Sequence, residues 1–218
     1  MASLQHPGMV CGALLNFRAD LEALGERMNG PPYLAPPRAP VLYLKPRNTW
    51  CGAGDDIPLP SSAAAVLVGA ALGLVIGRTA SRVSESAGAA HVRALCLAND
   101  VCLAHADIFR PAIKERCRDG FCPLGPAVVV SADDLAAPRR LRTFVNGRQA
   151  AQWSTAQCVR SPMQLLADVS AFMTLSPGDV LLLGTPRTMP SARPGDHVAV
   201  EIEGIGELRN RVVTERVP

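Results

Sequence analysis

The 218-residue sequence predicts a mostly β fold with some α-helix (α+β), arranged as a β-roll or sandwich in one compact domain. Many short runs are apolar or alternate between apolar and polar residues, and Gly, Pro, Asn and Asp bound them, which is the pattern of strands and turns. Segments with helical spacing are few and do not separate the strands regularly. This order disfavours a doubly wound parallel sheet.

The N-terminal part predicts a disordered lead-in, then a strand, then a helix over residues 20–28. Residues 1–17 lack the basic stretch and the cleavage site of a secretory signal. The connector 30–40 is dense in proline, so it cannot be helical and runs extended.

Residues 41–49 alternate in polarity and predict a strand that stops at Pro46. The strand leaves three polar side chains near its end, namely Lys45, Arg47 and Asn48. Strand ends are places where functional sites are commonly assembled.

Residues 57–77 form a run of 21 residues without a charge, which is nominally long enough to cross a membrane. Two prolines at its start, three glycines and a serine pair argue against a membrane helix, as does the absence of a flanking basic cluster. A buried strand pair, or a strand with a turn, is the preferred interpretation.

The remaining segments predict two helices and several strands. Residues 86–100 have apolar residues at helical spacing, and residues 161–175 begin with a capping Ser and a Pro at the first helical position, with Leu165, Val169 and Phe172 on one face. The strands are predicted over 121–130, in a hairpin around Asn146-Gly147 over 141–154, and in two Pro-Gly-Asp units over 177–186 and 194–213, the second folding back at 204–206.

The composition favours an oligomeric, cytoplasmic protein. Hydrophobic residues make up 48% and charged residues 19%, so part of the surface is expected to be covered by another subunit. The net charge of +3 without a basic run gives no reason to propose a nucleic-acid partner, but it suits a small anionic substrate. The seven cysteines form no CxxC pair, which indicates reduced thiols and neither a disulfide framework nor a zinc ribbon.

Three strings together resemble the fumarylacetoacetate hydrolase family: residues 98–101 (Ala-Asn-Asp-Val), 121–126 (Phe-Cys-Pro-Leu-Gly-Pro), and Gly184-Thr185-Pro186 followed by Pro-Gly-Asp and Gly-Ile-Gly-Glu-Leu-Arg-Asn-Arg-Val. Residues 33–49 and 109–126 are similar to the N-terminal half, or subunit, of the bifunctional isomerase/decarboxylases of 4-hydroxyphenylacetate (homoprotocatechuate) degradation. The resemblance runs from Gly12 to Val213.

The resemblance implies a mixed β-roll with a small N-terminal lobe, which we place at residues 61–218 and 1–60. It also implies Mg or Mn, held by a Glu-x-Glu pair and an Asp, as a Lewis acid for enolate chemistry on 2-oxo acids. Asp100 matches the ligand Asp, but Gly69 and Ala71 stand where the two glutamates belong. We therefore expect that this chain alone does not bind the metal, unless Asp107 or Glu115 replaces the lost carboxylates.

Other family residues are carried over position by position. Asp20, with Glu22 close by, stands where the family has a catalytic His, and a buried carboxylate can move a proton, although a solvated helix-start Asp is the plainer interpretation. No histidine matches a catalytic motif, and His6, His91, His105 and His197 are interpreted as solvated or structural.

Substrate-binding roles are expected for a group of basic and loop residues. Arg116 aligns with the family's substrate-binding Lys and keeps its charge, and Thr185 beside Gly184 resembles a substrate-contacting Thr. Arg118 is either a further anion contact or the partner of Asp119 in an ion pair that braces the loop. Lys45 and Arg47 are further candidates for carboxylate contacts.

These residues leave three functional interpretations. The first is a subunit that isomerises 5-carboxymethyl-2-hydroxymuconate or decarboxylates 5-oxopent-3-ene-1,2,5-tricarboxylate, together with a C-terminal-type subunit. The second is a non-catalytic structural subunit that supports such a partner. The third is a stand-alone acylpyruvate hydrolase or oxaloacetate decarboxylase, which the missing carboxylates disfavour. None of the three needs a nucleic acid or a membrane.

Overall fold

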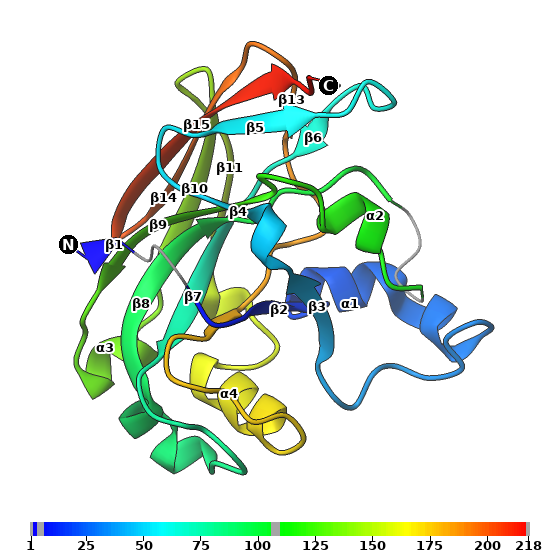
Figure 1. Ribbon diagram of the computed structural model, residues 1–218. Coiled ribbons are helices and arrows are strands. Elements are labelled where there is room, and N and C mark those ends of the chain that lie inside the picture. Colours follow the sequence, from blue (N-terminus) through cyan, green and yellow to red (C-terminus); the bar gives the residue numbers. More distant parts are fainter. Residues whose placement is uncertain (1, 4–6, 106–109, 217–218) are drawn as a thin grey trace.

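Two β-sheets packed face to face form the body of the molecule in the computed structural model, which describes residues 2–3, 7–105 and 110–216 (Figure 1). Within this part of the chain the larger sheet has eight strands, in the order β1-β9-β8-β7-β12-β2-β3 with β4 beside β9. Their bounds are β1 Ala2–Ser3, β2 Val10–Leu14, β3 Val41–Lys45, β4 Trp50–Cys51, β7 Ala70–Ile76, β8 Val92–Asn99, β9 Cys122–Val128 and β12 Val180–Leu182.

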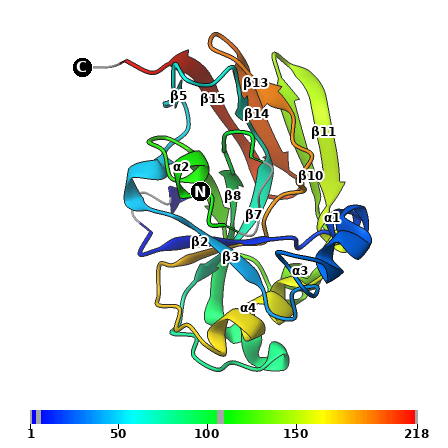
Figure 2. The ribbon, with the colours of Figure 1, turned by 90° about the vertical axis from the view of Figure 1, so that its right-hand side faces the viewer.

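The smaller sheet has five strands, in the order β11-β10-β14-β15-β5, and lies above the larger one in Figure 2. Its strands are β5 Asp56–Leu59, β10 Arg140–Val145, β11 Arg148–Ser154, β14 His197–Ile202 and β15 Gly206–Thr214. A separate pair is formed by β6 Val66–Leu67 and β13 Ser191–Ala192. The fold is therefore the predicted mixed, mostly β roll.

The helices are short and lie at the ends of the sheets. The α-helices are α1 Arg18–Leu24, α2 Ile113–Arg116, α3 Ala132–Ala136 and α4 Pro162–Ser170. The 3-10 helices span Gly25–Asn29, Arg47–Thr49, Glu85–His91 and Thr155–Gln157. No helix in the described ranges is long and apolar enough to cross a membrane.

The main core lies between the two sheets and α4. Leu72 and Leu74 of β7 pack there with Val200 of β14, Leu208 of β15 and Leu165 of α4. On the opposite face of β7, Ala71 and Val75 belong to a second apolar cluster. The strand is thus buried on both faces, and this explains why β7 contains no polar residue.

One predicted turn and one predicted helix start are confirmed at the residues that signalled them. Asn146 and Gly147 join β10 to β11 with φ values of 52° and 76°, the conformation of a tight hairpin turn. The Ser161 hydroxyl accepts a hydrogen bond from the backbone N–H of Gln164 at 3.1 Å, and Pro162 starts α4.

The helix predicted over residues 86–100 is wrong for most of its length. A 3-10 helix occupies Glu85–His91, and β8 follows over Val92–Asn99 between β7 and β9. Because a central strand buries both faces, its apolar residues fit a helical period as well as a strand. Asp100 therefore follows a strand and not a helix.

The predicted helix over 161–175 ends earlier than expected. Its last residue is Ser170, and Phe172 lies beyond it with 63% of its surface exposed. The backbone turns there because the carbonyl of Val169 accepts hydrogen bonds from both Phe172 and Met173. The helical period that placed Phe172 beside Val169 no longer applies after this turn.

The N-terminal segment contributes to the larger sheet and also projects from it. β2 pairs with β12 and β3 pairs with β2, while Leu15, Leu24 and Met28 form a small cluster of their own under α1. The division into a lobe of residues 1–60 and a roll of residues 61–218 stays a prediction. His6 of the predicted lead-in lies outside the described residues.

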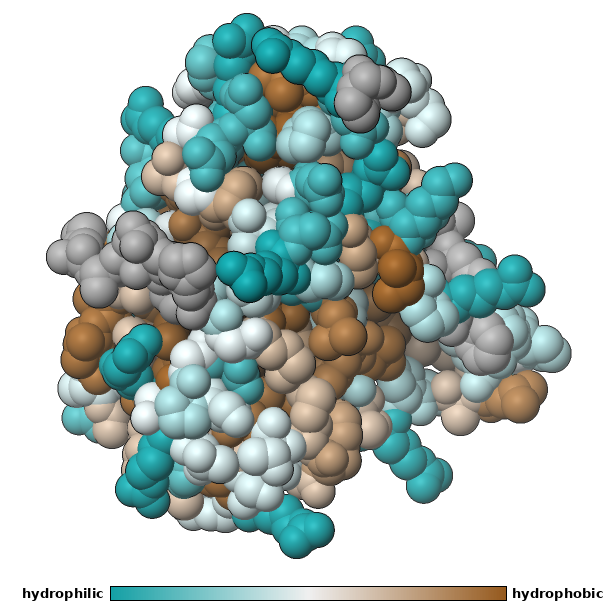
Figure 3. All heavy atoms as spheres, in the orientation of Figure 1, coloured by the Kyte–Doolittle hydropathy of each residue, from teal (hydrophilic) through white to brown (hydrophobic). Residues whose placement is uncertain are grey.

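Polar and apolar side chains are mixed on the face shown in Figure 3. Large apolar side chains exposed within the described ranges are Leu34, Leu44, Ile113, Val129 and Phe172. All seven cysteines are free, and burial raises the pKa of Cys11 and Cys96 to about 12, so these thiols stay protonated near neutral pH.

Candidate functional site

Asp100, the residue aligned with a metal ligand, lies at the end of β8 in a fully buried ion cluster. Its Oδ1 is 2.8 Å from Lys45 Nζ, and its Oδ2 is 3.2 Å from a terminal nitrogen of Arg116. The Tyr43 hydroxyl donates a further hydrogen bond to Oδ2 at 2.6 Å. Both carboxylate oxygens therefore already have cationic or hydroxyl partners.

The charges in this cluster stabilise one another. Burial by itself opposes ionisation of Asp100, but the attraction of Lys45 and Arg116 and the hydrogen bonds outweigh it and lower the pKa to about 2. Burial also opposes the charge on Arg116, and the neighbouring Asp100 reverses this and raises its pKa. The pKa of Tyr43 is raised by burial and by Asp100, so the phenol stays a donor.

The hydrogen bonds of the Lys45 ammonium all go to oxygen atoms, and the ammonium also lies 5.9 Å from the centroid of the Tyr43 ring. Besides Asp100, its ammonium donates to the backbone carbonyls of Val101 at 2.6 Å, Phe121 at 2.9 Å and Arg116 at 3.2 Å. Lys45 is 1% exposed. An ammonium surrounded by four oxygens satisfies a buried carboxylate much as a bound cation would.

The space next to Asp100 does not suit a divalent metal. The backbone N–H of Asp100 donates to the carbonyl of Gly69, yet a Cβ at Gly69 would lie 2.8 Å from Met189 Sδ and 3.0 Å from Thr185 Cγ2. Apolar atoms thus fill the place where a glutamate would begin. The described residues contain no group of three His, Cys, Asp or Glu placed to hold a metal.

Mg and Mn need several oxygen ligands and compensating negative charge. The single carboxylate here is already neutralised by Lys45 and Arg116, so the residues present do not fit the family's metal. Of the two suggested replacements, Glu115 lies in α2, and Asp107 lies outside the described residues.

A narrow pocket adjoins the ion cluster at Arg116. Its volume is about 30 Å³, and its lining consists of Leu14, Leu15, His105, Arg116, Thr185, Pro186, Arg187 and Met189. The structure thus brings together two of the predicted binding residues, Arg116 and Thr185. Arg116 is 94% buried, since its exposed fraction is 6%, and its Nε–H has no acceptor among the described residues.

Gly184 fixes the position of Thr185. Its φ is +88°, and a Cβ there would lie 2.0 Å from the carbonyl oxygen of Ala13. Only glycine permits this approach between the end of β12 and β2. The turn carries Thr185 into the lining of the pocket that Arg116 also lines.

Asp20 lies behind the pocket and does not line it. Both of its oxygens accept the backbone N–H of Arg187 at 3.1 Å, and burial raises its pKa, against the opposing effect of Arg187. Asp20 is buried, which contradicts the solvated interpretation. Glu22 lines a different hollow of about 630 Å³ beside α1 and β11.

The remaining predicted residues do not line this pocket. Arg118 pairs with Glu215 at 3.1 Å, so the suggested ion pair with Asp119 is wrong, and Asp119 instead accepts a hydrogen bond from Asn48. Arg47 is exposed beside a separate hollow lined in part by Trp50 and Pro46. Lys45 contacts that hollow, but its ammonium faces Asp100.

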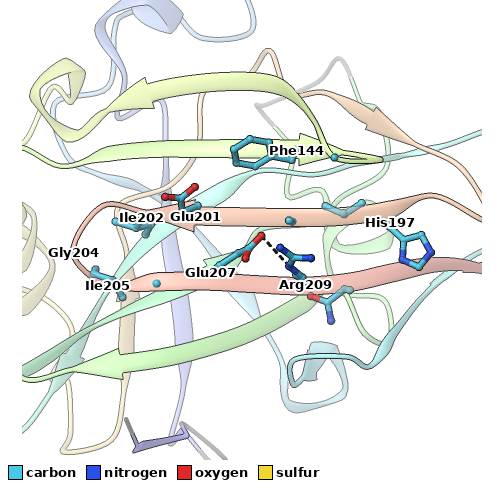
Figure 4. A pocket seen from close by; sticks show the side chains of 13 residues that line it. Phe144, His197, Glu201, Ile202, Gly204, Ile205, Glu207 and Arg209 are labelled. Carbon is cyan, nitrogen blue, oxygen red and sulfur yellow. Dashed lines mark ion pairs between the residues drawn. The ribbon is translucent and has the colours of Figure 1, made fainter.

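A wider trough of about 820 Å³ crosses β10, β14 and β15 (Figure 4). Its charged side chains come from alternating positions on the strands. Glu207 pairs with Arg209 at 3.0 Å, and Glu201 pairs with Arg142 at 2.6 Å. Charges that satisfy one another along an open sheet form no convergent site, so the pocket at Arg116 is the better candidate.

Sequence reasoning missed His105. It follows β8 and lines the same pocket as Arg116 and Thr185. No motif identifies it, and the only sequence signal is its position five residues after Asp100, on the chain that leaves the ion cluster.

Comparisons with known proteins agree with this fold. The model of the family described as fumarylacetoacetate (FAA) hydrolase C-terminal matches residues 9–213. The chain is 45% identical over 210 residues to the 4-hydroxyphenylacetate degradation bifunctional isomerase/decarboxylase of Escherichia coli, with 96% of this chain and 48% of that relative covered. The chain therefore spans about half the length of this curated relative.

Two solved structures extend the comparison. A 5-carboxymethyl-2-hydroxymuconate delta-isomerase from Mycobacterium smegmatis superposes with a TM-score of 0.82 at 32% identity, covering 97% of this chain and 80% of that one. A fumarylpyruvate hydrolase from Pseudomonas aeruginosa, solved with Mn²⁺ and pyruvate, has a TM-score of 0.81 at 21% identity, with coverages of 95% and 90%, and shares the fold. The family match over nearly the whole chain and the identity to its members place this protein in the fumarylacetoacetate hydrolase family.

Proposed function

We propose that this chain is the isomerase-type subunit of 4-hydroxyphenylacetate (homoprotocatechuate) breakdown and that it moves a proton within a 2-oxo polycarboxylate without a divalent metal. The observation that carries the proposal is the pocket in which Arg116, Thr185 and Arg187 meet beside an internal Lys45–Asp100–Arg116 cluster. The relatives' names point to the same substrates: the E. coli relative is a bifunctional isomerase/decarboxylase, and the M. smegmatis neighbour is an isomerase of 5-carboxymethyl-2-hydroxymuconate.

The chemistry of an isomerisation suits these residues. Moving a proton from an enol oxygen to a distant carbon needs an anchor for the carboxylates, donors for the developing oxyanion and a group that carries the proton. Arg116 supplies a rigid guanidinium whose Nε–H has no protein acceptor among the described residues. Thr185 supplies a hydroxyl on a turn held in place by Gly184.

Fixed cations can stabilise an enolate without a metal. Arg116 is oriented on one side by Asp100 and by the Tyr43 ring, whose centroid is 4.6 Å from the guanidinium carbon. Its geometry is therefore set before substrate arrives, and preorganised donors are the effective ones in catalysis. In the part of the chain that the structure describes, no group of three His, Cys, Asp or Glu is placed to hold a metal.

We assign the decarboxylation of 5-oxopent-3-ene-1,2,5-tricarboxylate to a C-terminal-type partner subunit. The curated relative is about twice as long as this chain, so a second half of that protein lies outside the matched region. We propose that this chain works in the cytoplasm, in a homo- or hetero-oligomer with such a partner.

One specific observation favours a second candidate, a non-catalytic subunit that only supports the partner. The pocket volume of about 30 Å³ accommodates a single carboxylate-sized group and no whole substrate. Under this alternative the ion cluster stabilises the fold and has no chemical role.

An ultraviolet assay distinguishes the two. The purified chain is mixed with 5-carboxymethyl-2-hydroxymuconate in the presence of EDTA, and again with added Mg²⁺. The proposal expects equal turnover in both. No turnover in either condition, with activity only after a C-terminal-type subunit is added, would establish the supporting role.

A further inference from the structure

The pocket beside Arg116 contains one side chain that the proposed function leaves without a role. His105 lies on the segment that follows β8 and lines the pocket with Arg116 and Thr185. The imidazole is half-buried, so part of it packs against the protein and part of it is accessible from the pocket.

The hydrogen bond of His105 determines which of its nitrogens is free. Its Nδ1 lies 3.0 Å from the carbonyl oxygen of Leu103. A carbonyl oxygen only accepts, so Nδ1 carries the proton, and in the neutral ring the lone pair is on Nε2. Within residues 2–3, 7–105 and 110–216 no group hydrogen-bonds to Nε2, and the ring lines the pocket.

The segment that carries His105 is itself fixed. The backbone N–H of Leu103 donates to the carbonyl of Glu115 at 2.9 Å, and Cys102 exchanges two hydrogen bonds with Leu67. Lys45 holds the carbonyl of Val101. The strand end, α2 and the ion cluster thus position the imidazole relative to Arg116.

We propose that His105 Nε2 is the group that carries the proton in the isomerisation, an inference that rests on the proposed function. The enol O–H bond of the substrate breaks and its proton passes to Nε2. The electron pair moves through the conjugated system, so that the enol C–O becomes C=O and the double bonds shift. The proton then passes from Nε2 to the distal carbon, where a C–H bond forms, and the imidazole is regenerated. No oxidant or other reactant is needed.

The surroundings favour this residue over Asp20 and Glu22. The charged groups that face the pocket are Arg116 from α2 and Arg187 from the segment between β12 and β13, and the other lining residues are uncharged. The Arg116 guanidinium is paired with Asp100 at 3.2 Å, and the charge of Arg187 acts on the nearby Asp20 and opposes the rise of its pKa. Both oxygens of Asp20 are occupied by the Arg187 N–H, and Glu22 lines another hollow.

The test compares His105→Gln and His105→Ala with a matched control, His91→Gln. His91 also binds a backbone carbonyl through Nδ1, that of Thr79 at 2.8 Å, but it lies on the 3-10 helix Glu85–His91 and does not line the pocket. We expect kcat to fall by about 100-fold or more in both His105 variants, because general acid–base catalysis commonly contributes that much. KM should change by less than about threefold, and added imidazole should restore part of the rate to His105→Ala.

Each outcome has one interpretation. If the wild-type chain is active and the His105 variants keep more than about a third of its kcat, His105 is not the proton carrier, and the proposed function stands. If His91→Gln loses as much activity as His105→Gln, the loss is structural and the inference fails. If the wild-type chain is inactive with EDTA and with Mg²⁺, the proposed function and this inference both fail.

Discussion

Replacing Lys45 with Met tests the idea that an internal ammonium takes the place of a metal ion. Met keeps most of the side-chain volume and removes the charge. The change leaves Asp100 Oδ1 without its closest cation, and three backbone carbonyls lose the hydrogen bond from the ammonium. Arg116 and Tyr43 remain on Oδ2.

The expected cost follows from burial. Removing one partner from a buried ion pair leaves an uncompensated charge, and such changes cost about 3–5 kcal/mol of the free energy of unfolding. The lowered pKa of Asp100, from 3.8 to about 2, corresponds to roughly 2 kcal/mol for burial and all of its partners together. For the loss of Lys45 we therefore use the lower end of the range for broken buried pairs, about 3 kcal/mol.

The assay is urea unfolding at pH 7, monitored by tryptophan fluorescence, with Lys114→Met as the control. Lys114 is an exposed lysine in α2, and its replacement should cost less than about 0.5 kcal/mol. A loss below about 1 kcal/mol in Lys45→Met would refute the reasoning. The double variant Lys45→Met/Asp100→Asn should be less destabilised than the sum of the two single changes, because the buried charge is gone.

Acidification gives a second measure of the same cluster. The folded pKa of Asp100 lies below its unfolded value, so its contribution to stability is fully present above about pH 4 and is lost as the pH falls through about 2. In Lys45→Met the pKa of Asp100 should rise, and the part of the acid-dependent loss that comes from this group should shrink.

Three further predictions concern the pocket and its surroundings. Gly184→Ala should lower the free energy of unfolding by more than about 2 kcal/mol, measured by urea unfolding, because a Cβ at φ +88° would lie 2.0 Å from the Ala13 carbonyl oxygen. Addition of millimolar Mg²⁺ or Mn²⁺ should shift the melting temperature by less than about 1 °C, since a ligand stabilises only a state that binds it; a rise of several degrees would show a metal site. Arg116→Gln should reduce kcat/KM for the isomerisation by at least about 100-fold, whereas Arg118→Gln, whose pair with Glu215 is partly exposed, should leave it within about threefold.

Elements that are signalled by the backbone preferences of a few neighbouring residues could be predicted from the sequence. The Asn146-Gly147 turn and the Ser161-Pro162 helix start depend on backbone preferences of the residues themselves. β8 was not predictable in this way, because both of its faces are buried. Its run of apolar residues therefore lacks the alternation of apolar and polar residues that distinguishes a strand from a helix.

The candidate site was predictable only in part. The resemblance placed Asp100, Arg116 and Thr185, and the structure brings the last two into one pocket. The partner of Asp100 was hidden, because Lys45 comes from a strand early in the chain and no local pattern connects the two. His105 was missed for the same reason, since its role depends on which segments meet around it.

The ion cluster also sets an order on how the chain can assemble. Lys45 joins carbonyls that lie 56, 71 and 76 residues further along the sequence, so its bonds form only after β3, β8 and α2 have met. Contacts between distant segments require the largest loss of chain entropy and form late in folding. A nascent chain whose residue 121 is still inside the ribosome therefore cannot complete the cluster, and its Lys45 and Asp100 remain hydrated. A fragment that starts after β3 would bury Asp100 without the ammonium of Lys45. The roll therefore depends on its N-terminal segment to neutralise its own buried aspartate.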